Sequence, residues 1–200
     1  MSENPYQSTK TDSTPLASPV MEQPSSVPKV FGIIHLVYAG LGMIGGLMGL
    51  ANPALAKFTT GPILEIAKKS GKSTEAYESA VAETARYAMM NGVVQIALAI
   101  LLLIAGLNLI KYQLKGAKLS KIWALARIPL AIVFSFLSMD ATKRMMTTQN
   151  ELIGTGNPSM DNMMETMGTV GIVFGILMVS VYPILTLIFL SRAKVMASLK

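Results

Sequence analysis

The stretch from Gly92 to Lys121 constrains the fold of this chain more than any other. It joins an apolar run, Val93 to Ile110, interrupted by Gln95 and Asn108, to the basic segment KYQLKGAKLSK. As an α-helix, about 18 apolar residues cross the roughly 30 Å hydrocarbon layer of a bilayer. The basic segment holds four lysines and no acid, a composition typical of cytoplasmic loops. The sequence therefore predicts an integral membrane protein and the side on which this loop lies.

The composition supports a lipid environment and excludes several classes of function. Hydrophobic residues make up 52% of the chain, charged residues 14%, and the mean hydropathy is +0.50. Soluble domains carry about a quarter charged residues. The net charge of +6 does not indicate nucleic-acid binding, because the cations lie beside apolar spans and not in a basic surface patch. Cysteine is absent, which excludes disulfides, thiolate metal sites and a cysteine nucleophile.

Four segments are long and apolar enough to cross a membrane. They cover about residues 30–50, 89–110, 122–139 and 167–190 within a membrane domain of residues 30–190. The lysine loop and residues 191–200 together hold seven Lys or Arg and no acid, whereas the two opposite excursions hold seven cations and eight acids. By the positive-inside rule, both termini are expected in the cytoplasm. The prediction is an all-α, four-helix transmembrane bundle, N-in/C-in.

The excursions between the spans are expected to be partly helical. Residues 52–88 begin with Pro53 and Pro62, which predict irregular structure, whereas residues 73–90 show the spacing and start signals of a helix that continues into the second span. The helix of the third span is expected to run on to about Leu152. Helices should therefore project on the outer face of the membrane.

The two ends of the chain are polar. Residues 1–29 carry five prolines and many Ser, Thr and Gln, which predicts a disordered cytoplasmic tail, and residues 191–200 are a basic cytoplasmic tail. The opening Asn4-Pro5-Tyr6-Gln7-Ser8 resembles that of many uncharacterised multispanning membrane proteins of planctomycete-type bacteria. This resemblance covers five residues, agrees with a bacterial cytoplasmic membrane and implies no activity. Ala54-Leu55-Ala56 also fits a signal-peptide cleavage site, but the preceding apolar run exceeds the usual length and favours a span.

Polar side chains in the spans form the first candidate site. Five of them are expected at a similar depth near the cytoplasmic face: His35, Asn108, Arg127, Tyr182 and Thr186. Trp123 is expected as an anchor at the membrane interface. Ionisable groups inside a membrane are costly, usually face the bundle interior and often serve function. Such a layer could hold a lipid phosphate or an anionic solute. The alternative is structural, with Arg127 reaching the surface and the other groups bridging helices.

Methionine gathers toward the outer half and forms the second candidate site. Four residues at helical spacing could share one face as a metal site: Met160, Met163, Met164 and Met167. Thioether sulfur is a soft ligand that suits Cu(I), and Met163 with Met167 resembles the Met-x-x-x-Met element of three-span copper transporters. The alternative is apolar packing, for which methionine is an adaptable filler. No resident cofactor is expected.

Glycines spaced four apart form small faces on which another helix can approach closely. These helix-packing candidates are Gly42, Gly45, Gly46, Gly49, Gly171 and Gly175. They suit packing within the chain, or contact with a second copy or another membrane protein. No catalytic arrangement of titratable residues is evident, so an enzyme is not expected. The leading hypothesis is a small accessory or interaction protein of the cytoplasmic membrane, and its rival is a transport component for an ion or small solute, in which the methionines would relate it to Cu(I).

Overall fold

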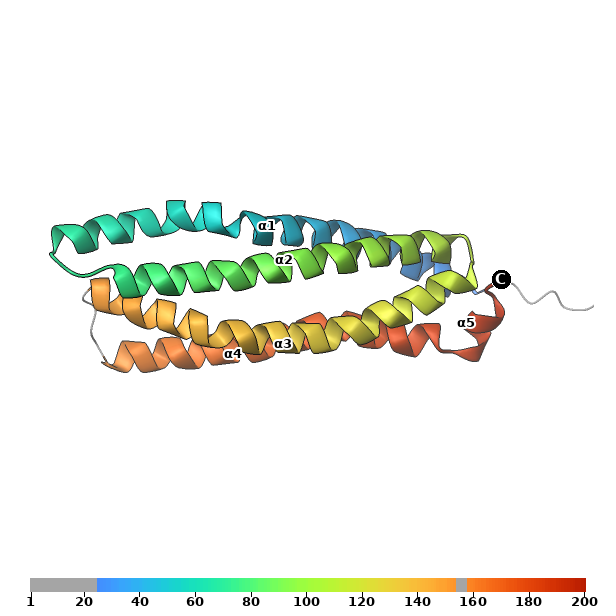
Figure 1. The fold of residues 1–200 in the computed structure, drawn as a ribbon. Helices are drawn as coiled ribbons and strands as arrows, with labels where there is room; N and C mark the ends of the chain where they lie inside the picture. Colours follow the sequence, from blue (N-terminus) through green and yellow to red (C-terminus); the bar gives the residue numbers. More distant parts are fainter. Residues whose placement is uncertain (1–24, 154–157) are drawn as a thin grey trace, which may run out of the picture.

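The computed structural model describes residues 25–153 and 158–200, except for the side chains of residues 158–165, 167–169 and 172. Within these limits every regular element is helical. In chain order the elements are α1 (Val27–Lys69), α2 (Glu75–Ile110), α3 (Leu114–Ile153), α4 (Pro158–Leu190) and α5 (Ala193–Ala197). The four long helices lie side by side, as Figure 1 shows, with the α1–α2 turn at one end and the α2–α3 turn at the other. We name these the outer and inner ends, after the orientation expected from the sequence.

The surface of the bundle is that of a membrane protein. All four long helices contain segments long and apolar enough to cross a bilayer. Large apolar side chains point outward along these segments: Leu41 on α1 is 61% exposed and Leu177 on α4 is 60% exposed. Continuous apolar surface of this kind is stable against lipid and not against water. The predicted all-α four-helix bundle is thereby confirmed.

Helix α1 corrects the expectation of irregular structure after Asn52. It continues through Pro53 and Pro62 to Lys69. Each proline removes one backbone hydrogen bond. The part of α1 that follows Pro62 is nevertheless held in place by packing at the outer end. There Ala67 is buried against Tyr77 and Leu152. Residues 75–90 belong to α2 and residues up to Ile153 to α3, so both helices continue beyond their apolar spans as predicted.

A glycine seam brings α1 and α2 into backbone contact. A methyl group placed on Gly92 would lie 2.7 Å from the carbonyl oxygen of Gly46, and one on Gly49 would lie 3.0 Å from Cα of Gly92. Nearer the inner end, a methyl group on Gly32 would lie 2.8 Å from the carbonyl oxygen of Gly106, and one on Gly106 would lie 2.9 Å from the carbonyl oxygen of Gly32. These distances leave no room for any side chain, so the glycines set the spacing of the two helices.

The basic loop and the basic tail are more ordered than their composition suggests. The turn itself is short, because α3 already begins at Leu114. Residues 191–200 fold back over it through α5: Val195 is buried, and Lys200 bonds the backbone of Tyr112 and Leu114 at 2.8 Å each. Burial of the apolar side of the tail against Leu109 stabilises this arrangement.

Candidate functional site

A hydrogen-bonded histidine lies at the centre of the bundle's inner half. His35 is fully buried, its Nε2 lies 2.8 Å from Oγ of Ser120, and its Nδ1 bonds the hydroxyl of Tyr182. Ser120 uses its one proton to bond the carbonyl oxygen of Gly116 at 2.8 Å. Ser120 must therefore accept from His35, which places the ring proton on Nε2 and makes Nδ1 the acceptor of the Tyr182 proton. Every polar position of the imidazole is thus satisfied.

Aromatic rings close the space around this network. Tyr38 stacks on Tyr182 with ring centroids 4.1 Å apart, and Trp123 meets the same ring edge-on at 5.8 Å. Thr186 is fully buried one turn away, where its hydroxyl donates to the Tyr182 carbonyl. Together these residues form the inner plug, which consists of His35, Ser120, Trp123, Tyr182 and Thr186. Because its polar groups bond one another, the inner plug is a packed core.

Arg127 lies at a deeper level than the inner plug. Seven residues separate it from Ser120 on α3, which corresponds to about 10 Å along the helix. Its guanidinium donates to Oε1 of Gln95 on α2. Asn108 instead donates to Ile104 of its own helix at 3.0 Å. The structure therefore does not join these residues in one hydrogen-bonded layer: Arg127 bonds Gln95 at a deeper level than His35, and Asn108 bonds its own helix.

Two cavities meet at Arg127. The larger, of about 470 Å³, lies between α2, α3 and α4, and we name it the vestibule. The smaller, of about 320 Å³, touches all four long helices and reaches down to Tyr38 and Trp123 of the aromatic packing. Arg127 and Val179 line both cavities. The inner plug thus closes the lower end of a space that extends toward the outer half of the bundle.

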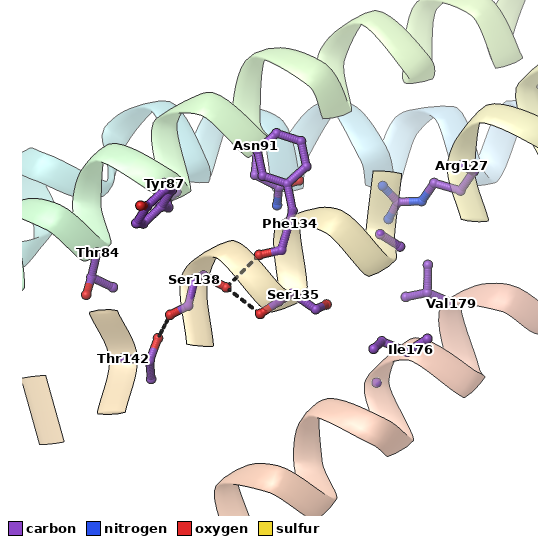
Figure 2. Close-up of a pocket in the computed structure, with 13 residues that line it drawn as sticks. Thr84, Tyr87, Asn91, Arg127, Phe134, Ser135, Ser138, Thr142, Ile176 and Val179 are labelled. Atoms are coloured by element: carbon purple, nitrogen blue, oxygen red, sulfur yellow. Dashed lines mark hydrogen bonds between the residues drawn. The ribbon is translucent and has the colours of Figure 1, made fainter. Parts of the chain in front are cut away.

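The vestibule is lined by hydroxyl and amide groups and by one cation. Its polar residues, all labelled in Figure 2, are Thr84, Tyr87, Asn91, Arg127, Ser135, Ser138 and Thr142. The hydroxyls of Ser138 and Thr142 bond carbonyls of their own helix at 2.8 Å. Among the described side chains, no carboxylate lines the vestibule and none pairs with Arg127. The cavity therefore combines one positive charge with neutral polar groups.

Three residues of this region were assigned another role or none from the sequence. Trp123 was expected as an interfacial anchor, but it is 5% exposed and belongs to the core, because its ring packs against Tyr182 and His35. Ser120 was part of the lysine loop. Gln95 was an interruption of an apolar run, and this interruption is the signal that could have identified it as the partner of Arg127.

The remaining candidates lie elsewhere. A methyl group on Gly42 would lie 3.2 Å from Cβ of Ala99, and one on Gly45 would lie 3.8 Å from Nε2 of Gln95, so both glycines face α2 like Gly46 and Gly49. Methyl groups on Gly171 and Gly175 would meet no described atom within 4 Å, and Gly175 lines the vestibule. The four methionines fall in the part of α4 whose side chains are outside the described residues: Met160, Met163, Met164 and Met167.

Where side chains are described, no group of three His, Cys, Asp or Glu residues is placed to hold a metal ion. The chemistry that the site offers is therefore recognition of a negative charge by a guanidinium with neighbouring hydroxyl and amide groups. Comparison with protein-family models, with curated proteins and with solved structures gives no match.

Proposed function

We propose that this chain is a multi-pass protein of a bacterial cytoplasmic membrane that binds an anionic solute at Arg127, as a component of its transport. The observation that carries this proposal is the guanidinium of Arg127, which lines two cavities and has only the neutral Gln95 as a described partner. A cation at membrane depth is stable when an anion or a polar cavity compensates its charge. A solute that brings the missing negative charge fits this arrangement.

The direction of the Arg127 side chain favours a ligand site over simple escape to the membrane surface. An arginine that snorkels would extend toward the nearest headgroups, which lie at the inner end close to the lysine turn. Figure 2 shows the guanidinium directed into the cavity, toward the side on which Asn91 lies. The positive charge of Arg127 therefore faces the vestibule.

The inner plug gives the proposed path one closed end. Solute would enter from the outer half and stop at Arg127, since the packed rings of Tyr182 and Trp123 lie beyond it. Pro183 follows Tyr182 in α4 and cannot donate to the carbonyl of Val179, which lines both cavities. This weak point of the helix is a suitable hinge for the movement of Tyr182 that release on the inner side would need.

Both chain ends are proposed to lie in the cytoplasm. The support is the cation distribution: the inner end carries the lysine turn and the basic tail, with seven Lys or Arg and no acid. The lipid bilayer is the surrounding partner. No nucleic-acid contact and no catalytic step are part of the proposal.

A second candidate function is that of an accessory protein that docks another transmembrane helix. The observation that favours it is the open face of α4 at Gly171, where an added methyl group would meet no described atom within 4 Å, while Gly46 and Gly49 are occupied by α2. A second copy of the chain or another membrane protein could pack there closely. This role needs no solute, so a binding experiment separates the two candidates.

The test is anion binding by purified protein, measured calorimetrically with phosphate, sulfate and small carboxylates. Wild-type protein should bind at least one of them, and Arg127→Gln should weaken that binding by about 30-fold or more, the expected effect of losing a desolvated charge contact. The matched control is Arg144→Gln, because Arg144 is exposed and already pairs with Glu83 at 3.3 Å. This control should bind like the wild type.

Two results would contradict solute binding at Arg127. One is equal weakening by both substitutions, which would indicate a general effect of charge. The other is the absence of binding by wild-type protein across the whole panel, which would leave the accessory role at the open face of α4 as the better account.

A further inference from the structure

A further cavity, separate from the two that meet at Arg127, lies between α1 and α2 toward the outer end. Its volume is about 560 Å³, and we name it the outer groove. Apolar residues form most of its wall, namely Pro53, Ala56, Leu64, Val81, Ala82, Ala85 and Met89. The polar side chains along it are Lys57, Thr60, Tyr77, Glu78 and Arg86. It is thus an amphipathic groove with two cations.

The outer groove begins where the glycine seam ends. A methyl group on Gly49 would still lie 3.0 Å from Cα of Gly92 and 2.8 Å from the carbonyl oxygen of Ala88. The following residues of α1 carry side chains, which keep the two helices farther apart. Pro53 lies in α1 where the groove begins. Its ring takes up space, and it has no N–H for a backbone hydrogen bond. Beyond the groove the helices are closed again by the buried pair Ala67 and Tyr77.

The two cations lie at the depth of lipid headgroups. The apolar span of α1 ends near Leu50 and that of α2 begins near Met89, so Lys57 and Arg86 follow the hydrocarbon edge by about 5 to 10 Å along their helices. The headgroup layer on each side of a bilayer is of similar thickness. A lipid in this leaflet would therefore present its phosphate to both side chains.

The charges of Lys57 and Arg86 are available for such a contact. Both side chains are exposed, and neither forms a salt bridge with a described residue. Glu78, the acid of the groove, accepts a hydrogen bond from Thr74 and lies about 12 Å along α2 from Arg86. The membrane-facing end of the groove is therefore positive.

We propose that the outer groove binds an anionic phospholipid from the leaflet on the side of the α1–α2 turn. The phosphate lies between Lys57 and Arg86, the headgroup covers Ala82 and Ala85, and the acyl chains pass Met89 on their way into the hydrocarbon layer. The cations supply attraction to the negative headgroup, and the apolar wall gains from being covered. This site does not depend on the function proposed for Arg127.

The test is native mass spectrometry of full-length protein in detergent, titrated with phosphatidylglycerol and, separately, with phosphatidylethanolamine of the same acyl chains. We expect tighter retention of phosphatidylglycerol, and a loss of about tenfold or more in Lys57→Gln/Arg86→Gln. The matched control is Lys68→Gln/Lys69→Gln, which removes two exposed cations from the outer end of α1. Inorganic phosphate should not displace the lipid.

A steric variant separates a built groove from general attraction to positive charge. Ala82 is exposed and lines the groove, so Ala82→Trp should fill it and lower phosphatidylglycerol retention while both cations remain. The proposal is overturned if Lys68→Gln/Lys69→Gln weakens retention as much as Lys57→Gln/Arg86→Gln. It is equally overturned if Ala82→Trp leaves retention unchanged, if the two lipids bind alike, or if inorganic phosphate displaces the phospholipid.

Discussion

Gly92→Ala is expected to destabilise the bundle by about 3 kcal/mol, because a single added methyl group has no space between α1 and α2. It would lie 2.7 Å from the Gly46 carbonyl oxygen and 3.0 Å from the Leu50 nitrogen. Both atoms belong to a helix backbone, so relief requires movement of the whole helix. The contacts along the glycine seam would then loosen together. Equilibrium unfolding in mixed micelles measures the effect.

Gly40→Ala is the matched control for this prediction. Gly40 lies in α1 as well, but a methyl group there would meet nothing within 4 Å. Alanine is the better helix former by about 1 kcal/mol, so this substitution should be neutral or stabilising. Equal stability of Gly92→Ala and Gly40→Ala would show that the seam does not set the helix spacing.

His35→Ala is expected to cost about 3 kcal/mol, since it leaves both a cavity and an unpaired phenol in the inner plug. His35 is fully buried, and Tyr182, which is 8% exposed, would lose the acceptor of its hydroxyl proton. Tyr182→Phe alone should cost about 1 kcal/mol. The double variant should cost about 1 kcal/mol less than the sum, because each substitution removes the same hydrogen bond.

Asn108→Ala provides the comparison for His35. Asn108 was predicted from the sequence in the same polar layer, but its amide bonds only Ile104 of its own helix and should contribute less than about 1 kcal/mol. Additive costs for His35→Ala and Tyr182→Phe would contradict the hydrogen-bonded plug. So would equal costs for His35→Ala and Asn108→Ala.

The sequence was sufficient to predict the spans, because a bilayer demands about 20 apolar residues per helix and few other segments meet that demand. The continuation of α2 outward beyond Met89 was likewise predictable from helix start signals. The path of α1 past Pro53 was not. Proline has a strong local effect, whereas the packing of Ala67 against Tyr77 that outweighs it joins residues from two helices and becomes visible only in the fold.

The site was predictable in its most unusual members and not in their partners. His35 and Arg127 stand out because ionisable groups are rare in apolar spans. Gln95 and Ser120 are ordinary polar residues, and their importance depends on which neighbour they face. Depth was also misjudged, since counting residues from span ends gave His35 and Arg127 the same level, whereas the hydrogen bonds place Arg127 beside Gln95. The contact between Gly32 and Gly106 was also missed, because it depends on which neighbour each glycine faces.

Solute entry from the outer side requires water in the vestibule as far as Arg127, and cysteine labelling tests this requirement. The chain contains no cysteine, so a single introduced thiol reports without background. Ser138 lines the vestibule, whereas its neighbour Leu137 is 46% exposed on the apolar surface. Thiols react as thiolates, which form in water and not in lipid. A membrane-impermeant maleimide added to intact cells should therefore label Ser138→Cys and not Leu137→Cys, and the bound anion should slow the labelling unless Arg127→Gln is also present. Equal labelling of Ser138→Cys and Leu137→Cys, or labelling of Ser138→Cys only after the cells are opened, would contradict solute entry into the vestibule from the outer side.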